Sequence, residues 1–210
     1  MATERFEKLS DDKKKRILIA AREEFARVPY EEASINQIIK NAGISRGSFY
    51  TYFEDKNDLL QYVFSEDEED SRRFFRELVL ENDGDFWKAI TDWTVKVAGY
   101  LKQGTIQQRI NILANTGIMK RAVVWTENDC SKKQEREKEQ LDWLMEKLDL
   151  SLLDYRGSRE RFEAIVKSAH MISGLAILNL IAYQNQDKEK ILEEFHLKMN
   201  VLRFGADTRK

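Results

Sequence analysis

The 210-residue chain contains one proline, nine glycines and 34% charged residues, and its formal net charge is −2 at pH 7. The scarcity of helix breakers favours an all-α fold of one or two domains, and the near-neutral charge predicts only weak non-specific affinity for nucleic acids. A single cysteine, Cys130, excludes an internal disulfide, and the most apolar stretch, residues 171–183, is too short to span a membrane, so we expect a cytoplasmic protein.

The first predicted helix follows Ser10, a residue type that caps helix N-termini, and ends near Arg27. Apolar residues recur along it at helical spacing, and they are Ile17, Leu18, Ala21, Phe25 and Val28. This pattern predicts an amphipathic helix with one buried face.

A second, shorter helix is predicted over residues 35–42. Ser34 precedes this helix, and Gln37 lies in its first turn, three residues later. This is the spacing of a capping box. Its apolar residues, Ile35, Ile38, Ile39 and Ala42, share one face. Gly43 then suits the left-handed conformation that ends a helix.

A third helix is predicted to begin after Ser45, which can act as its N-cap. Phe49 and Phe53 are four residues apart and would anchor this helix to the core. The rotation of about 100° per residue then turns a polar set outward. That set is Arg46, Gly47, Tyr50 and Thr51, with Ser45 and Ser48 at its edge. Two short helices with a glycine turn and an outward polar face are typical of a helix-turn-helix DNA reader.

The segment GISRGSFYTYFEDKNDLL resembles the recognition segment of the TetR family of bacterial transcriptional regulators. The resemblance rests on the order and spacing of Ala42, Gly43, Ile44, Ser45, Gly47, Ser48, Phe49, Tyr50, Tyr52, Phe53, Lys56 and Leu59. Two positions depart from the family pattern. Pro29 stands where the family usually has glycine, and Ile39 stands where alanine usually follows the isoleucine.

The resemblance implies a role for each residue of the proposed DNA face. Phosphate contacts are implied for Ser34, Tyr50, Tyr52 and Lys56. Base-edge contacts are implied for Ser45, Arg46, Gly47, Ser48 and Thr51. Among these, only Arg46 has the reach for a bidentate contact with guanine.

Asp55 is predicted to cap a longer helix that continues to a turn at residues 82–84. The acidic run at residues 66–70 interrupts its pattern, which indicates either a solvated face or a local break. Further helices are predicted at about residues 85–102, 106–116, 118–126, 132–148, 159–184 and 188–203.

Neither a catalytic constellation, a Gly-rich phosphate loop nor a metal-ligand spacing occurs, so no enzyme, cofactor or metal is predicted. An aromatic group in the central region is a candidate lining for a small-molecule site, with Asn115 as a polar partner. The candidate residues are Phe86, Trp87, Trp93, Tyr100, Asn115, Met119 and Trp125. The alternative is that these residues only fill the core.

The last two predicted helices carry broad apolar faces. In the TetR family, the last two helices pair with those of a second copy, so the resemblance implies a homodimer. Its predicted interface comprises Phe162, Ile165, Ala169, Ser173, Ile177, Leu180, Phe195 and Met199. The residues alone are equally compatible with an intramolecular core.

The resemblance thus implies an all-helical protein with a helix-turn-helix DNA-binding domain at residues 1–58 and a ligand-sensing and dimerisation domain at residues 59–210. Such a protein represses transcription and leaves a palindromic double-stranded operator when a small-molecule effector moves the helix that begins near Asp55. The alternative is a helical protein-interaction adaptor that does not bind DNA.

Overall fold

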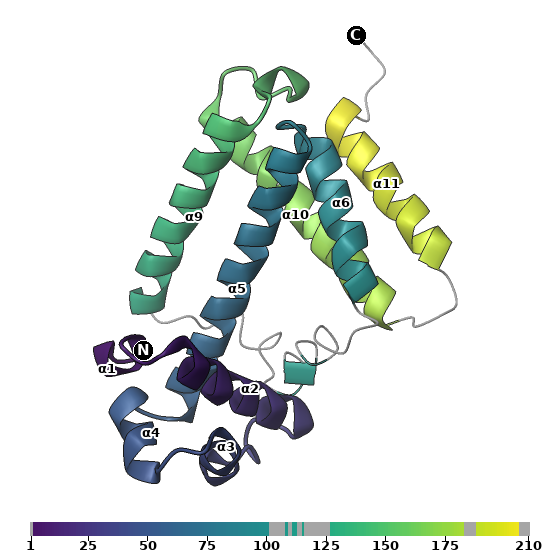
Figure 1. Cartoon of the computed structure of the whole chain (residues 1–210). Coiled ribbons are helices and arrows are strands. Elements are labelled where there is room, and N and C mark those ends of the chain that lie inside the picture. Colours follow the sequence, from purple (N-terminus) through teal and green to yellow (C-terminus); the bar gives the residue numbers. More distant parts are fainter. Residues whose placement is uncertain are drawn as a thin grey trace. The chain divides into compact units, whose positions relative to one another are not determined.

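The structure, a computed structural model, describes residues 2–100, 108, 111, 112, 115, 127–182 and 188–205. The regular secondary structure of these residues is helical (Figure 1), which confirms the predicted all-α fold. Its elements are α1 (Glu4–Glu7), α2 (Asp11–Arg27), α3 (Ile35–Ala42), α4 (Arg46–Tyr52), α5 (Lys56–Glu81), α6 (Phe86–Tyr100), α9 (Glu127–Lys147), the 3-10 helix η2 (Leu150–Leu152), α10 (Arg159–Ala182) and α11 (Lys188–Phe204). None of these helices is long and apolar enough to cross a membrane. The predicted helices at 106–116 and 118–126 lie outside the described residues, apart from the four residues named above.

The chain divides into two compact units. Unit 1 comprises residues 1–71 and 104–125, and unit 2 comprises residues 72–103 and 126–210. The division falls inside α5, which therefore contributes to both units, whereas the sequence placed the boundary after residue 58. The functional division at residue 58 stays a prediction.

Unit 1 is built around the amphipathic helix α2. The predicted buried stripe is confirmed, because Ile17, Leu18, Ala21 and Phe25 are all buried. Helix α1 was not predicted, since a single turn is too short to show a helical period. Its Phe6 is nevertheless fully buried, with ring centroids 4.7 Å from Phe53 and 5.0 Å from Tyr62.

Unit 2 contains the C-terminal part of α5 together with α6, α9, α10 and α11. Its largest fully buried side chains are Leu78, Phe86, Ile90, Phe162 and Phe195. The turn between α5 and α6 requires glycine, because Gly84 has φ 80° and a Cβ there would lie 2.7 Å from the carbonyl oxygen of Lys147. This close approach brings the start of α6 against the end of α9.

Helix α5 runs without a break through the acidic residues 66–70. The predicted local break is therefore wrong. Of the five acidic residues, Glu68 and Glu69 are exposed, whereas Glu66, Asp67 and Asp70 are half-buried. Within this run, the Asp67 carboxylate pairs with the guanidinium of Arg22 on α2 at 2.8 Å. The acidic run thus ties α5 to α2 inside unit 1.

Candidate nucleic-acid interface

Helices α3 and α4 form the predicted helix-turn-helix. Gly43 ends α3 in the left-handed conformation (φ 66°, ψ 39°), and the N–H of Ile44 donates to the carbonyl of Ile39 at 3.0 Å. Ser45 caps α4, since its Oγ accepts the N–H of Ser48 at 3.0 Å. These contacts confirm both predicted helix ends and fix the path from α3 into α4.

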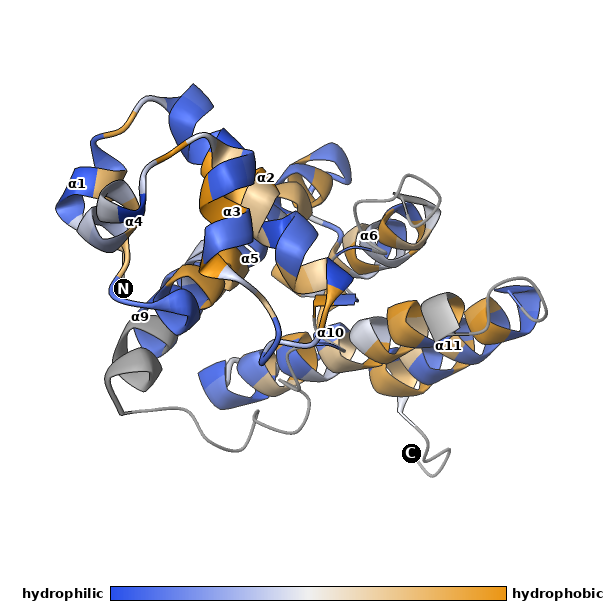
Figure 2. Ribbon diagram, turned by 90° about the horizontal axis from the view of Figure 1, so that it is seen from below, coloured by the Kyte–Doolittle hydropathy of each residue, from blue (hydrophilic) through white to orange (hydrophobic). Residues whose placement is uncertain are grey.

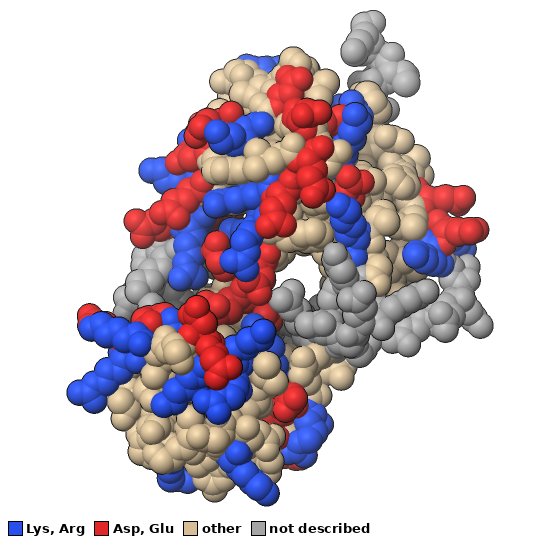
Figure 3. Space-filling model, viewed as in Figure 1, with Lys and Arg blue, Asp and Glu red and all other residues tan. Residues whose placement is uncertain are grey.

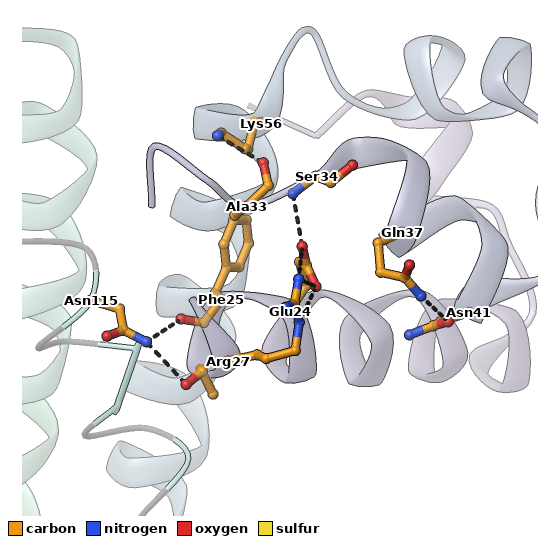
Figure 4. A network of polar contacts seen from close by, with 10 residues as sticks. Glu24, Phe25, Arg27, Ala33, Ser34, Gln37, Asn41, Lys56 and Asn115 are labelled. Atoms are coloured by element: carbon orange, nitrogen blue, oxygen red, sulfur yellow. Dashed lines mark hydrogen bonds and ion pairs between the residues drawn. The ribbon is translucent and has the colours of Figure 1, made fainter. Parts of the chain in front are cut away.

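The start of α3 differs from its prediction. Ser34 is the N-cap residue, but its hydroxyl makes no capping bond, and the Gln37 side chain donates to Asn41 at 2.9 Å instead. The predicted capping box is therefore wrong. Glu24 of α2 takes its place: its Oε1 accepts the N–H of Ser34 at 2.8 Å, while Arg27 pairs with the same carboxylate at 2.8 Å (Figure 4). Glu24 is 2% exposed, so a buried, ion-paired carboxylate fixes where α3 begins.

Helix α4 has one buried and one open face, as predicted. Phe49 and Phe53 are fully buried and anchor the helix. The open face is polar and consists of the exposed Ser45, Arg46, Gly47 and Tyr50 with the half-buried Ser48 and Thr51. This face carries hydroxyl and guanidinium donors without a competing apolar patch.

Hydrogen bonds hold the polar side chains of this face in place. Arg46 donates from Nη1 to the Asn36 side chain on α3 at 2.7 Å, and its guanidinium carbon lies 5.6 Å from the ring centroid of Tyr50. The Thr51 hydroxyl donates to the carbonyl of Gly47 at 2.9 Å. Arg46 is therefore oriented between the two helices before any ligand is bound.

Tyr52 differs from the rest of the predicted DNA face, because its ring is buried. The residue is 8% exposed and packs edge-on against Phe6 at 5.9 Å. Its hydroxyl accepts a hydrogen bond from Lys13 Nζ at 3.2 Å. Only this hydroxyl, with the ammonium of Lys13 beside it, remains as a phosphate-binding group.

Lys56 makes a structural contact that was not predicted. Its ammonium lies 4.5 Å from the ring centroid of Tyr30, and it donates to backbone carbonyls of the preceding turn. Those carbonyls belong to Tyr30 at 2.6 Å, Ala33 at 2.9 Å and Glu31 at 3.4 Å. An ammonium has three N–H donors, and all three are directed at the protein backbone. The side chain of Lys56 therefore stabilises the turn before α3, which leaves the backbone N–H of Lys56 for the predicted phosphate contact.

The N-terminal residues bind the far end of α4. The Thr3 N–H donates to the carbonyl of Tyr52 at 3.0 Å, and the Thr3 hydroxyl donates to the carbonyl of Thr51 at 2.8 Å. Carbonyls at a helix C-terminus lack intrahelical partners, so Thr3 satisfies two of them.

Burial, reinforced by the carboxylates of Glu66 and Glu7, raises the pKa of Tyr62 on α5, which keeps its hydroxyl protonated beside α1.

The predicted small-molecule site is only partly assembled by the structure. Phe86 is fully buried in unit 2, and Trp87 is buried with its Nε1 donating to the carbonyl of Leu152 at 3.0 Å. Trp93 is half-buried in the same unit. Asn115 belongs instead to unit 1, where it contacts α2. The side chains of Tyr100, Met119 and Trp125 lie outside the described residues.

Trp93 belongs to an aromatic cluster that also contains a histidine, His170. The His170 ring lies 6.0 Å from Trp93 and 4.8 Å from Phe75, and its Nδ1 is 2.9 Å from the carbonyl of Val166. Burial lowers the pKa of His170 below its ordinary value of 6.5, so the imidazole is neutral at pH 7. The indole Nε1 of Trp93 is buried and has no hydrogen-bond partner within the described part of the chain.

The predicted dimer residues lie mainly inside the single chain. Phe162, Ala169, Ser173, Ile177, Phe195 and Met199 are buried, whereas Ile165 and Leu180 are half-buried. The Ser173 hydroxyl forms a hydrogen bond with the hydroxyl of Thr94 on α6. Most of these residues are thus part of the intramolecular core, and their role in a dimer interface stays a prediction.

A different face of α10 and α11 is apolar and exposed. Both helices contain many hydrophobic residues, as the colouring of the ribbon in Figure 2 shows, and some of them are exposed. The exposed residues, with their exposed fractions, are Met171 (72%), Leu175 (47%), Leu178 (38%), Leu197 (64%), Val201 (47%) and Phe204 (70%). On each helix the spacing is i, i+4, i+7, which places the three side chains in one row. We call these six residues the α10–α11 outer face.

Charges of both signs are interspersed over the molecular surface seen in Figure 3. This agrees with the sequence of residues 1–60, which holds eleven basic and eleven acidic residues. Across the residues that the structure describes, no group of three or more His, Cys, Asp or Glu side chains is placed to hold a metal ion.

The sequence of the helix-turn-helix and its flanking helices matches a known family. Residues 17–63 match the family model described as bacterial regulatory proteins, tetR family. This match identifies residues 17–63 as a TetR-family helix-turn-helix domain. TetR-family proteins are helix-turn-helix transcriptional regulators and not enzymes.

Two curated relatives come from Bacillus subtilis (strain 168), and both are uncharacterised HTH-type transcriptional regulators. YdgC is 32% identical over 71 residues, which cover 34% of this chain and 36% of YdgC. YhgD is 33% identical over 57 residues, which cover 27% of this chain and 30% of YhgD. The matches thus span about a third of each relative's length.

A solved structure extends the similarity in fold over almost the whole chain. It is the crystal structure of a TetR family transcriptional regulator from Chloroflexus aurantiacus J-10-FL. The TM-score is 0.51, and the alignment covers 97% of this chain and 92% of the other. Because the sequence identity is 19%, this likeness concerns the TetR fold alone.

Proposed function

We propose that this protein is a ligand-responsive repressor of the TetR family that binds a palindromic double-stranded DNA operator in the cytoplasm. The observation that carries the proposal is the open face of α4, where Arg46 and Tyr50 are exposed above the buried Phe49 and Phe53. A short helix with this polarity, packed behind a glycine turn, suits insertion into a major groove.

The contacts of individual residues support a division of roles. Arg46 extends from α4 with two Nη groups and is the candidate for guanine recognition. The hydroxyls of Ser45, Ser48 and Thr51 and the open backbone at Gly47 are placed for shorter base contacts. Phosphate contacts are proposed for Ser34, Tyr50, the hydroxyl of Tyr52 and the N–H of Lys56.

We further propose that two copies associate through the α10–α11 outer face. Its six large apolar residues form two rows on helices that pack against each other within one chain. Covering such a patch removes apolar area from water, which is the main driving force of association. A two-fold dimer also presents two recognition helices, as a palindromic operator requires.

The effector is proposed to bind at the aromatic cluster of Phe75, Phe86, Trp93 and His170 in unit 2. The buried Nε1 of Trp93 supports this assignment, because a buried donor without a partner costs about 1–3 kcal/mol. An apolar molecule with an acceptor oxygen would satisfy that donor. By linkage, such an effector and the operator weaken each other's binding by the same factor.

Selection of bound duplexes from a random pool tests the DNA-binding proposal, followed by titration of the best duplex at two salt concentrations. We expect a palindromic consensus and an affinity that falls with salt, because phosphate contacts release counterions. Selection that enriches no duplex sequence would favour the adaptor alternative. Arg46→Ala serves as the matched variant, since it alters the open face without touching the core.

A further inference from the structure

The C-terminus of α2 lacks the hydrogen bonds that another helical turn would supply. In a continuing helix, the N–H of residue 29 would donate to the carbonyl of Phe25, and that of residue 30 to the carbonyl of Ala26. Residue 29 is Pro29, which has no N–H, and Val28 before it is extended (φ −137°, ψ 160°). The carbonyls of Phe25 and Ala26 therefore need donors from elsewhere in the chain.

Asn115 supplies both donors. Its side-chain Nδ2 donates to the carbonyl of Phe25 at 3.2 Å and to that of Ala26 at 3.0 Å (Figure 4). Its own backbone carbonyl accepts the N–H of Tyr30 at 3.0 Å. A side-chain amide has two N–H groups, so each carbonyl receives its own hydrogen. Asn115 thus replaces two helical bonds, the one to Phe25 that Pro29 cannot form and the one to Ala26 that is lost where the helix ends.

The turn bound by Asn115 is also bound to the start of α5. The carbonyl of Tyr30 accepts from Lys56 at 2.6 Å, and that of Ala33 accepts from the same ammonium at 2.9 Å. Helix α3 begins directly after this turn, at Ile35. The position of Asn115 therefore helps to determine where α3 begins and, through the Gly43 turn, where α4 lies.

The chain around Asn115 connects the two units. Residues 104–125 group with unit 1, although the chain before and after them belongs to unit 2. This segment is thus covalently tied to unit 2 at both of its ends, at residues 103 and 126. Asn115 is thus joined to unit 2 through the chain on both sides and hydrogen-bonded to α2 within unit 1.

We propose that Asn115 is a positioning residue for DNA recognition, which couples the segment 104–125 to the recognition helix by holding the C-terminus of α2. The proposal rests on the proposed function of DNA binding, and it adds a second covalent connection, besides α5, through which the effector acts. It also relates to the departure at Pro29: proline leaves the carbonyl of Phe25 without its helical donor, and Asn115 supplies a donor to this carbonyl and to that of Ala26.

Asn115→Asp tests this role in the full-length protein, because it preserves the side-chain shape and replaces two donors with an acceptor. At about pH 8, where the carboxyl group is ionised, we measure amide hydrogen exchange at Tyr30 and affinity for the duplex that the wild-type protein selects. We expect faster exchange at Tyr30 and about tenfold weaker binding, with unchanged helix content by circular dichroism.

Gln108→Glu is the matched control, since it adds the same charge to the same segment seven residues earlier and should leave both measurements unchanged. Unchanged exchange at Tyr30 in Asn115→Asp, or faster exchange with wild-type affinity, would overturn the proposal. An equal effect of Gln108→Glu would overturn it as well, because charge alone would then account for the result. Asn115→Ser, which retains a single donor, replaces Asn115→Asp if that variant does not fold. A wild-type protein that selects no duplex contradicts the proposed function itself.

Discussion

The open face of α4 and the α10–α11 outer face are both rows of exposed side chains on surface helices, but they are stabilised in opposite ways. On α4, side-chain hydrogen bonds orient the polar groups, as between Arg46 and Asn36. On α10 and α11, large apolar side chains extend into solvent, with Met171 and Phe204 about 70% exposed. Polar recognition depends on orientation before binding, whereas apolar association depends on the area removed from water. Each face should therefore respond to a different kind of substitution.

The largest expected effect separates the outer face from the core of the same helix. Leu175 is 47% exposed and Ile177 is 8% exposed, two residues apart on α10. Leu175→Asp should give a folded monomer. The dissociation constant of the dimer should rise at least about 100-fold, because the dimer would bury an unpaired charge. Ile177→Asp should lower the free energy of unfolding by about 3 kcal/mol or more at every protein concentration.

Sedimentation and chemical unfolding distinguish these two outcomes. A Leu175→Asp variant that remains a stable dimer would show that the interface lies elsewhere. A folded, monomeric Ile177→Asp variant would instead support the interface predicted from the sequence, which includes Ile177.

The next comparison lies within the family motif, between Lys56 and Tyr50. Lys56→Ala should lower the free energy of unfolding by about 1–2 kcal/mol, because it removes charged donors from partly buried carbonyls. Tyr50→Ala should leave stability unchanged and weaken duplex binding about fivefold. Lys40→Ala, at an exposed position of α3, is the control for loss of a lysine. Equal stability of Lys56→Ala and Lys40→Ala would argue that the Lys56 contacts contribute little.

Arg46→Ala should relax base preference at one position of each half-site, at a cost of about 1–3 kcal/mol if both Nη groups contact guanine. Arg46→Lys retains the charge but not the planar fork, so it should lose preference while keeping the salt dependence. Selection from a random duplex pool measures the preference. An unaltered consensus with weaker binding would assign Arg46 to phosphate.

The smallest expected effect concerns the N-terminal contact with α4. Thr3→Val removes the hydroxyl that donates to the carbonyl of Thr51 and preserves the side-chain shape. We expect a loss of about 0.5 kcal/mol in duplex binding, with Thr3→Ser restoring the wild-type value. Identical affinities for all three proteins would mean that the end of α4 needs no such support.

Local patterns predicted the helix-turn-helix well, because its glycine turn, its serine cap and its aromatic anchors all act within a few residues. Ser45, Gly43 and Phe49 do in the structure what their spacing implies. The failures in this unit involve bonds between distant residues. Glu24 reaches Ser34, and Lys56 reaches Tyr30, and no periodicity connects such pairs.

The sequence did not distinguish the exposed apolar face of α10 from its buried faces, and for a different reason. The helix is apolar over most of its circumference, so periodicity does not distinguish the side that packs on α6 from the side left open. Ser173 illustrates the problem, since a small polar residue suggests a close helix contact but does not say with which helix. Only the packing of α6 and α11 around α10 determines which apolar residues remain exposed.

The buried carboxylate of Glu24 has a consequence for protein engineering. A DNA specificity is often transplanted by moving a recognition helix and its turn into another scaffold. Here residues 34–53 alone would arrive without the carboxylate that receives the first N–H of the motif, ten residues upstream. A chimera that moves specificity intact should therefore begin its transplanted segment before Glu24, within α2, and should keep Arg27 to neutralise the carboxylate.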